Sequence, residues 1–185
     1  MKKTLVAALL STAFAFSAAV QAQTYEVDGQ NSLVEFQYKQ MGVTMTGRFA
    51  DLQGTIIFDK EAPERMSAQI QLPLDTVDTG TEEADEELVK PEWFDMAQHP
   101  TATFESVQIS ALKEDQYTVD GVLQIKGQTQ ELSFPVTVSH DESGKLVFEA
   151  EFAIDRGDFN IGSGSWSDPS LVSNEVTIKA RVVSQ

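Results

Sequence analysis

The chain has 185 residues, no cysteine and a formal net charge of −16 at pH 7. The lack of cysteine excludes disulfides, thiol nucleophiles and cysteine-based metal sites, and it leaves no cysteine to carry a lipid anchor. A strongly negative surface repels nucleic acid and anionic lipid head groups, so we expect neither as a partner and no stable membrane anchor.

The N-terminus has the pattern of a secretory signal peptide. Two lysines precede an apolar run over residues 5–16, and Val20-Gln21-Ala22 matches the small-x-small pattern of a signal-peptidase site. The run is shorter than the roughly 20 apolar residues that span a membrane. We therefore expect residues 1–22 to be a signal peptide cleaved after Ala22, and residues 23–185 to form one exported domain; a buried N-terminal helix is the alternative.

The rest of the chain is dominated by β periodicity. Residues 66–74 are apolar at every even position and polar or proline at every odd one, which indicates a half-buried strand. In chain order we expect strands at residues 32–41, 43–49, 51–59, 66–74, 101–112, 117–125, 132–138, 146–154 and 176–182. Alternation over whole strands leaves one dry face. That face is buried only if the sheet closes into a barrel or packs on a second sheet.

One stretch interrupts this pattern, at residues 80–98. Its first part is rich in helix formers and acidic residues, which suit a helix N-terminus. Pro91 should end that helix, and Pro100 should stop a second short turn before the next strand. We expect a short helical excursion across one end or side of the sheet structure.

Five sequence blocks resemble, in order, the motifs of the YceI-like family. The match runs from about Tyr25 to Val183 and rests on Gly47-Arg48-Phe49 with Leu52-Gln53-Gly54, Asp75–Gly80 with Asp85–Leu88, Glu92–Asp95 with His99–Phe104, Gly121–Thr129, and Arg156–Ile161. The resemblance implies an all-β, lipocalin-like antiparallel barrel of about eight strands and a periplasmic or secreted location. It also implies an elongated interior that holds a polyisoprenoid, in some members an isoprenoid quinone.

Most of the predicted ligand-binding residues are aromatic. Phenylalanines at the core-facing phase of their strands are expected to line the interior: Phe36, Phe58, Phe104, Phe134, Phe148 and Phe152. Phe94 and Phe159 belong to two of the family-like blocks and complete the phenylalanine set. Ordinary filling of the barrel by these rings is the alternative that the sequence leaves open.

Other predicted contacts lie outside the strands or at their ends. Met41 and Met45 flank the first hairpin, and methionine adapts to irregular ligands. Trp93 and Trp166 lie in the two non-strand segments, where an indole suits the rim of a cavity mouth. Arg156 is a candidate to hold a carbonyl or hydroxyl of a ligand head group; an internal salt bridge with Asp158 is the alternative.

Catalytic and metal chemistry find little support in the sequence. The acidic run of residues 82–87 lacks the spacing of a calcium loop. His99 and His140 are the two histidines, with no zinc-ligand spacing and no Gly-x-Ser-x-Gly elbow to form a hydrolase triad. We therefore expect no metal and no cofactor beyond a bound polyisoprenoid or quinone.

Three functions remain in competition. The first is a periplasmic carrier that binds an apolar isoprenoid lipid. The second is an enzyme acting on such a lipid, which would need a polar cluster such as Arg156, Asp158 and His99 deep in the barrel. The third is a filled barrel with a structural or interaction role, to which a homodimer through the hairpin of residues 32–49 would fit.

Overall fold

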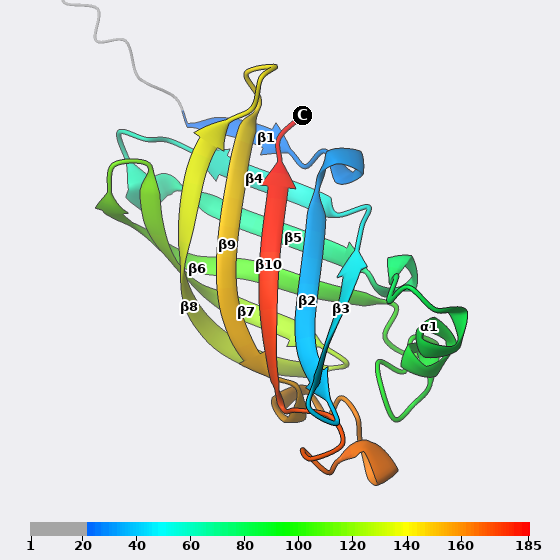
Figure 1. The fold of residues 1–185 in the computed structure, drawn as a ribbon. Coiled ribbons are helices and arrows are strands. Elements are labelled where there is room, and N and C mark those ends of the chain that lie inside the picture. Colours follow the sequence, from blue (N-terminus) through cyan, green and yellow to red (C-terminus); the bar gives the residue numbers. More distant parts are fainter. Residues whose placement is uncertain (1–21) are drawn as a thin grey trace, which may run out of the picture.

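A computed structural model describes residues 22–185 of the chain. It shows one curled antiparallel sheet with the strand order β1-β4-β5-β6-β7-β8-β9-β10-β2-β3 (Figure 1). The predicted signal peptide falls on residues 1–21, outside the described residues, apart from Ala22. Its cleavage therefore stays a prediction.

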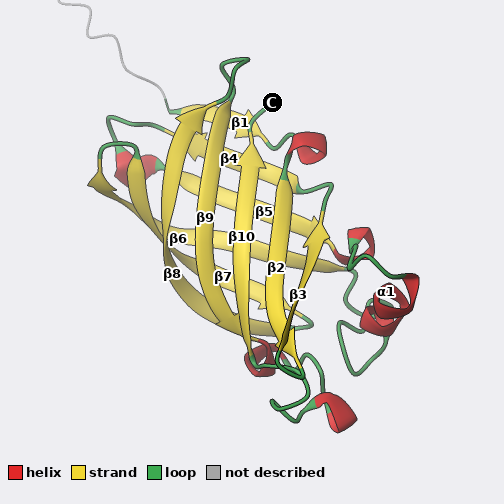
Figure 2. Ribbon diagram, in the orientation of Figure 1, coloured by secondary structure: helices red, strands yellow, loops and turns green. Residues whose placement is uncertain are grey.

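The strands follow the predicted ones closely. They are β1 Gln23–Glu26, β2 Leu33–Gln40, β3 Val43–Phe49, β4 Gln53–Phe58, β5 Ser67–Pro73, β6 Thr101–Lys113, β7 Gln116–Ile125, β8 Gln128–His140, β9 Leu146–Asp155 and β10 Glu175–Val183. Figure 2 shows β9, β10, β2 and β3 in front of β4 to β7, which cross behind them at a steep angle. The sheet thus curls around one interior, as the predicted barrel requires.

All nine strand ranges expected from the sequence are present, and within residues 22–185 the sheet has ten strands, where the resemblance implied about eight. The strand that the sequence did not show is β1, which is only four residues long and reads Gln-Thr-Tyr-Glu. A strand that short carries no usable alternation. It exists because it pairs with β4, where Tyr25 lies opposite Ile56.

The tightest hairpins are set by their turn residues. In the β2–β3 turn, Met41 and Gly42 have φ values of 48° and 80°; in the β7–β8 turn, Lys126 and Gly127 have φ values of 50° and 72°. Two consecutive residues with positive φ form the turn whose twist matches that of antiparallel strands. These turns fix the register that points alternate residues inward.

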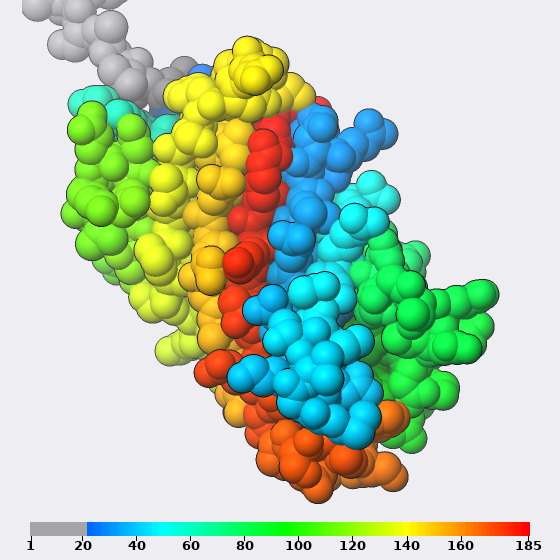
Figure 3. All heavy atoms as spheres, viewed as in Figure 1, coloured from blue at the N-terminus to red at the C-terminus, as the bar shows by residue number. Residues whose placement is uncertain are grey.

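The helical excursion is confirmed in part. Helix α1 spans Glu82–Val89, and the side chain of its N-cap Thr81 accepts a hydrogen bond from the backbone N–H of Ala84. The rest of the excursion, up to residue 98, consists of turns. Figure 3 shows this segment, in green, beside the β2–β3 hairpin, in blue and cyan.

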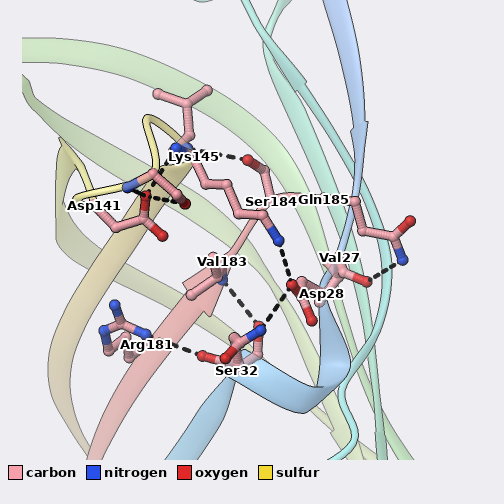
Figure 4. Close-up of polar contacts among 12 residues, drawn as sticks. Val27, Asp28, Ser32, Asp141, Lys145, Arg181, Val183, Ser184 and Gln185 are labelled. Atoms are coloured by element: carbon pink, nitrogen blue, oxygen red, sulfur yellow. Dashed lines mark hydrogen bonds and ion pairs between the residues drawn. The ribbon is translucent and has the colours of Figure 1, made fainter.

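One end of the barrel is held by a polar cluster around the C-terminus, which we call the serine end (Figure 4). The buried hydroxyl of Ser184 accepts the N–H of Leu146 at 3.0 Å, and that of Ser32 accepts the N–H of Val183 at 2.9 Å. The ammonium of Lys145 donates to Asp28 at 2.6 Å. These bonds join β10 and β9 to the segment between β1 and β2.

A candidate ligand-binding cavity

The curled sheet encloses a cavity of ≈ 260 Å³. Nine of the ten strands contribute lining residues, and all but a few of these are apolar. The exceptions are Thr103, Arg156, the phenols of Tyr38 and Tyr117, and the indole of Trp93. A cavity of this composition suits an apolar ligand, because a polar one would lose its water without gaining partners.

Some of the side chains that line the cavity are only half-buried, whereas others, such as Phe134 and Val138, are buried. On β2, Val34, Phe36 and Tyr38 line the cavity and are only half-buried, as are Phe148 and Phe152 on β9. In a filled barrel such positions would lose nearly all of their exposure, since protein interiors are close-packed. The sheet therefore presents apolar surface to an open space rather than to a completed core.

Aromatic rings form three groups along this interior. Phe36, Tyr38, Phe49 and Phe94 make one group, with ring centroids of Phe36 and Phe49 5.3 Å apart. In the second, Phe134 stacks on Phe152 at 4.4 Å and contacts Phe104 at 5.4 Å. In the third, Phe58 meets Tyr117 and Phe148 edge to face. Rings in contact hold each other in fixed orientations and give the cavity a defined shape.

The end of the barrel opposite the serine end is organised by Arg156, and we call it the arginine end. Arg156 lies in the 3₁₀ helix η4 (Arg156–Phe159) after β9 and is 4% exposed. All five of its N–H groups donate to backbone carbonyls, at 2.7–3.0 Å: those of Ile161, Gly162, Trp166, Val172 and Ser173. Burial lowers the pKa of Arg156, against the nearby Asp155, which raises it.

These hydrogen bonds bear on both predicted roles of Arg156, a salt bridge with Asp158 and a contact with a ligand head group. Of residues 22–185, none forms a salt bridge with Arg156, so the pairing with Asp158 is not formed. The guanidinium has no N–H left for a ligand head group, although the side chain lines the cavity. Gly162 is required beside it, because its φ is +73° and a Cβ there would lie 2.2 Å from Nη1 of Arg156.

Two tryptophans and a carboxylate lie at the same end. Trp93 is buried and packs on Trp166 with ring centroids 5.5 Å apart. Trp166 donates its indole N–H to Glu87 at 3.2 Å, and Lys90 also donates to Glu87. These hydrogen bonds, the one from Lys90 above all, lower the pKa of Glu87. The indole N–H of Trp93 is buried without a hydrogen-bond partner among the described residues.

Nine of the thirteen predicted ligand-binding residues line the cavity: Phe36, Phe58, Trp93, Phe94, Phe104, Phe134, Phe148, Phe152 and Arg156. The other four do not. Met41 is 70% exposed at the tip of the β2–β3 hairpin, and Met45 is on the edge strand β3. Phe159 is 1% exposed in the core beside the cavity, and Trp166 packs against that same core. Whether any of the thirteen binds a ligand stays a prediction.

Several lining residues were not singled out from the sequence. They are the aliphatic members of the same alternating rows, such as Ile70, Leu123, Val138 and Ile178, together with Met66 and Tyr117. The alternation placed these residues on the inward face of their strands, but we selected mainly aromatic residues as ligand-binding candidates. Lys126 was also missed: it donates to the carbonyls of Pro91 and Asn160 at 2.6 and 2.8 Å and so ties three loops together at the arginine end.

The described part of the chain contains neither a cluster of candidate metal ligands nor a long apolar helix. Within residues 22–185 no three His, Asp or Glu side chains are grouped as metal ligands. Over the same range no helix has the length and hydrophobicity to cross a membrane.

The chain is similar to proteins of one family along most of its length. The YceI-like domain matches residues 25–184. A UPF0312 protein of Pseudomonas aeruginosa is 33% identical over 141 residues, which is 75% of this chain and 71% of the relative. Protein YceI of Salmonella arizonae is 30% identical over 173 residues, covering 87% and 88% of the two chains.

Solved structures show the same fold. The crystal structure of Burkholderia cenocepacia BcnA matches with a TM-score of 0.81 at 33% identity, over 86% of this chain and 99% of BcnA. A polyisoprenoid binding domain from Saccharophagus degradans matches with a TM-score of 0.71 at 19% identity, over 87% and 97% of the two chains. The curled sheet and its interior are therefore shared architecture.

Proposed function

Because the chain belongs to the YceI-like family, we propose that it binds a long-chain polyisoprenoid or isoprenoid quinone in its cavity and acts as a periplasmic carrier. One observation carries the proposal: the side chains that line the cavity are almost all apolar, and those on β2, together with Phe148 and Phe152 on β9, are only half-buried around an open space. The fold shared with a protein described as a polyisoprenoid binding domain supports this choice of ligand. The signal-peptide pattern supports the compartment.

The physical basis of binding is the removal of hydrocarbon from water. Burial stabilises an apolar chain by roughly 0.8 kcal/mol per CH₂. A polyisoprenoid tail offers many such groups in a row, and the cavity offers aromatic and aliphatic walls along its length. Few hydrogen bonds are needed, which agrees with the small number of polar lining residues.

Carriage is favoured over catalysis by the positions of the polar side chains. The enzyme hypothesis needs a polar cluster inside the barrel, for which Arg156, Asp158 and His99 were the candidates. Arg156 is surrounded by backbone carbonyls, whereas Asp158 and His99 are not among the residues that line the cavity. Among residues 22–185 this candidate cluster is therefore not assembled in the cavity, and general acid–base chemistry needs its groups within hydrogen-bonding reach of the substrate.

The hairpin that was considered for a homodimer lies at one edge of the sheet. Its outer strand β3 pairs with β2 on one side, and the sheet ends there apart from a bridge between Arg48 and Asp78. An edge strand can pair with a second copy. A homodimer stays a prediction, which the mass measurement below also tests.

The test is native mass spectrometry of protein purified from the periplasmic fraction, followed by solvent extraction of anything bound. We expect a stoichiometric adduct with the mass of a polyprenyl lipid or a quinone. If delipidated protein shows no saturable uptake of any isoprenoid, the carrier proposal is wrong and the filled-barrel role replaces it.

A cavity-blocking variant locates the ligand. Ala150 lines the cavity from the middle of β9, so Ala150→Trp should place an indole in the space that the lipid occupies. Bound isoprenoid should then fall about tenfold, since overpacking costs roughly 1–3 kcal/mol. The matched control is Glu151→Gln, the exposed next residue on the opposite face, which should bind as the wild type does. Equal binding by all three proteins would place the lipid elsewhere.

A further inference from the structure

Six cavity-lining side chains form a continuous row across the interior, which we call the phenylalanine row. Strand pairing places Phe36 opposite Ile178 and Ile178 opposite Phe152. Phe152 stacks on Phe134, and Phe134 contacts Phe104. Phe104 in turn lies opposite Ile70 on β5. The row thus runs through β2, β10, β9, β8, β6 and β5, which surround the interior on both layers of the curled sheet (Figure 1).

The two terminal phenylalanines of this row lie directly over glycines. Gly47 is opposite Phe36 in the β2–β3 pair, and a Cβ on Gly47 would lie 2.3 Å from Cζ of Phe36. A Cβ on Gly121, in β7, would lie 2.4 Å from Cζ of Phe104. Both contacts are far shorter than van der Waals distance. Each ring can therefore rest against the wall only because the residue beneath it has no side chain.

The φ angles of these two glycines give no other reason for their presence. Neither is among the residues with positive φ, so an L-amino acid could adopt the backbone of either position. At Gly121 the added Cβ would also meet the carbonyl oxygen of Glu105 at 2.6 Å, which is a backbone contact. At Gly47 the three nearest atoms all belong to the Phe36 ring. A side chain at position 47 would therefore press on a cavity-lining ring, whereas one at position 121 would also press on the backbone.

We propose that the phenylalanine row sets the bore of the cavity, and that Gly47 is a specificity-determining residue for the length of the bound isoprenoid chain. This inference rests on the proposed function. Lining residues continue on both sides of the row: Leu88, Phe94 and Ile154 toward the arginine end, and Met66, Tyr117 and Val182 toward the serine end. A long chain must pass the row, whereas a short chain fits on one side of it.

The decisive variant is Gly47→Ala. Its methyl group displaces the Phe36 ring away from the wall, which narrows the cavity at the row. We expect affinity for solanesol, a long polyprenol, to fall about tenfold or more, because the displaced ring occupies space that the long chain must pass through. Affinity for the short farnesol should change by less than about twofold. Both are measured by titration of delipidated protein.

Two further variants distinguish an effect on the width of the cavity from an effect on folding. Phe36→Leu combined with Gly47→Ala removes ring volume where the methyl group was added, and solanesol binding should recover. Ile178→Phe enlarges the row without touching a glycine, so it should reproduce the selective loss even if the Gly47 variant folds poorly. Thr46→Ala, an exposed neighbour in β3, is the matched control and should bind both alcohols as the wild type does.

The outcomes distinguish the two claims. Selective loss of solanesol in the Gly47 and Ile178 variants supports the bore. Equal loss of both alcohols, or no loss of either, overturns it while leaving the carrier proposal intact. If the wild-type protein binds neither alcohol nor any other isoprenoid, the proposed function fails and this inference fails with it.

Discussion

The serine end and the arginine end both hold loops against the sheet, but they differ in how many side chains supply the hydrogen bonds. At the serine end, two buried hydroxyls and the Asp28–Lys145 pair each make one or two bonds, next to strands that are already paired (Figure 4). At the arginine end, one guanidinium collects five carbonyls from a segment of about a dozen residues, mostly without regular structure.

The difference follows from what each segment lacks. The carbonyls of residues 161–173 have no sheet ladder to satisfy them, and buried carbonyls must find donors. Arg156 supplies five donors in one plane, which no other side chain does. Stability at this end should therefore depend on one residue, whereas at the serine end it should be shared.

The largest expected effect comes from Arg156→Met. Removing the guanidinium leaves several buried carbonyls without donors, and we expect a loss on the order of 3–5 kcal/mol in the free energy of unfolding. Urea denaturation measures it. Arg156→Lys should recover only part of the loss, because an ammonium has three donors and no planar fork. A loss below about 1 kcal/mol would show that water replaces the guanidinium at little cost.

Ser184→Ala should have a smaller effect. It leaves the N–H of Leu146 buried and unpaired, which costs about 1–3 kcal/mol. The same urea titration serves as the measurement, with the exposed Ser133→Ala on β8 as a control for loss of a serine at the surface. If Ser184→Ala were as damaging as Arg156→Met, the contrast between the two ends would be wrong.

Asp28→Asn tests whether the stability contributed by the Asp28–Lys145 pair at the serine end depends on pH. Hydrogen bonds from Lys145 and then Asn31 lower the pKa of Asp28 below its ordinary value of 3.8. A carboxyl whose pKa is lower in the folded state contributes stability above the unfolded pKa and loses it as the pH falls through the folded value. The stability difference between wild type and Asp28→Asn should thus be present at neutral pH and shrink below pH 3.8. A difference that is constant with pH would contradict this.

Trp166→Phe should have the smallest effect on stability. It removes the hydrogen bond to Glu87 but keeps an aromatic ring against Trp93, so its unfolding midpoint should move less than that of Ser184→Ala. The variant also leaves Trp93 as the single tryptophan of the chain. Its fluorescence should then report whether a bound isoprenoid reaches the arginine end. An unchanged spectrum on saturation would place the ligand nearer the serine end.

Much of the fold was predictable because its signals are local. Alternation identified the inward face of five strands and the sequence pattern located four more, and Lys126-Gly127 marked the tight turn between β7 and β8. The phase of the strands accounts for six of the nine predicted residues that line the cavity: Phe36, Phe58, Phe104, Phe134, Phe148 and Phe152. Met41 and Phe159 were predicted from the hairpin and from a family-like block, and neither lines the cavity. Met41 lies at a hairpin tip beyond the wall, and the 3₁₀ turn of Phe159 packs into the core beside the cavity.

The sequence by itself determined the β class, the inward face of the strands with clear alternation and the apolar character of the interior, because a period of two is visible within a single strand. Only the tertiary structure decided which rows meet across strands, that Arg156 binds carbonyls rather than Asp158, and that Gly47 lies under Phe36. These contacts join residues that are distant in the chain or on different strands. Their geometry depends on the register and curl of the whole sheet.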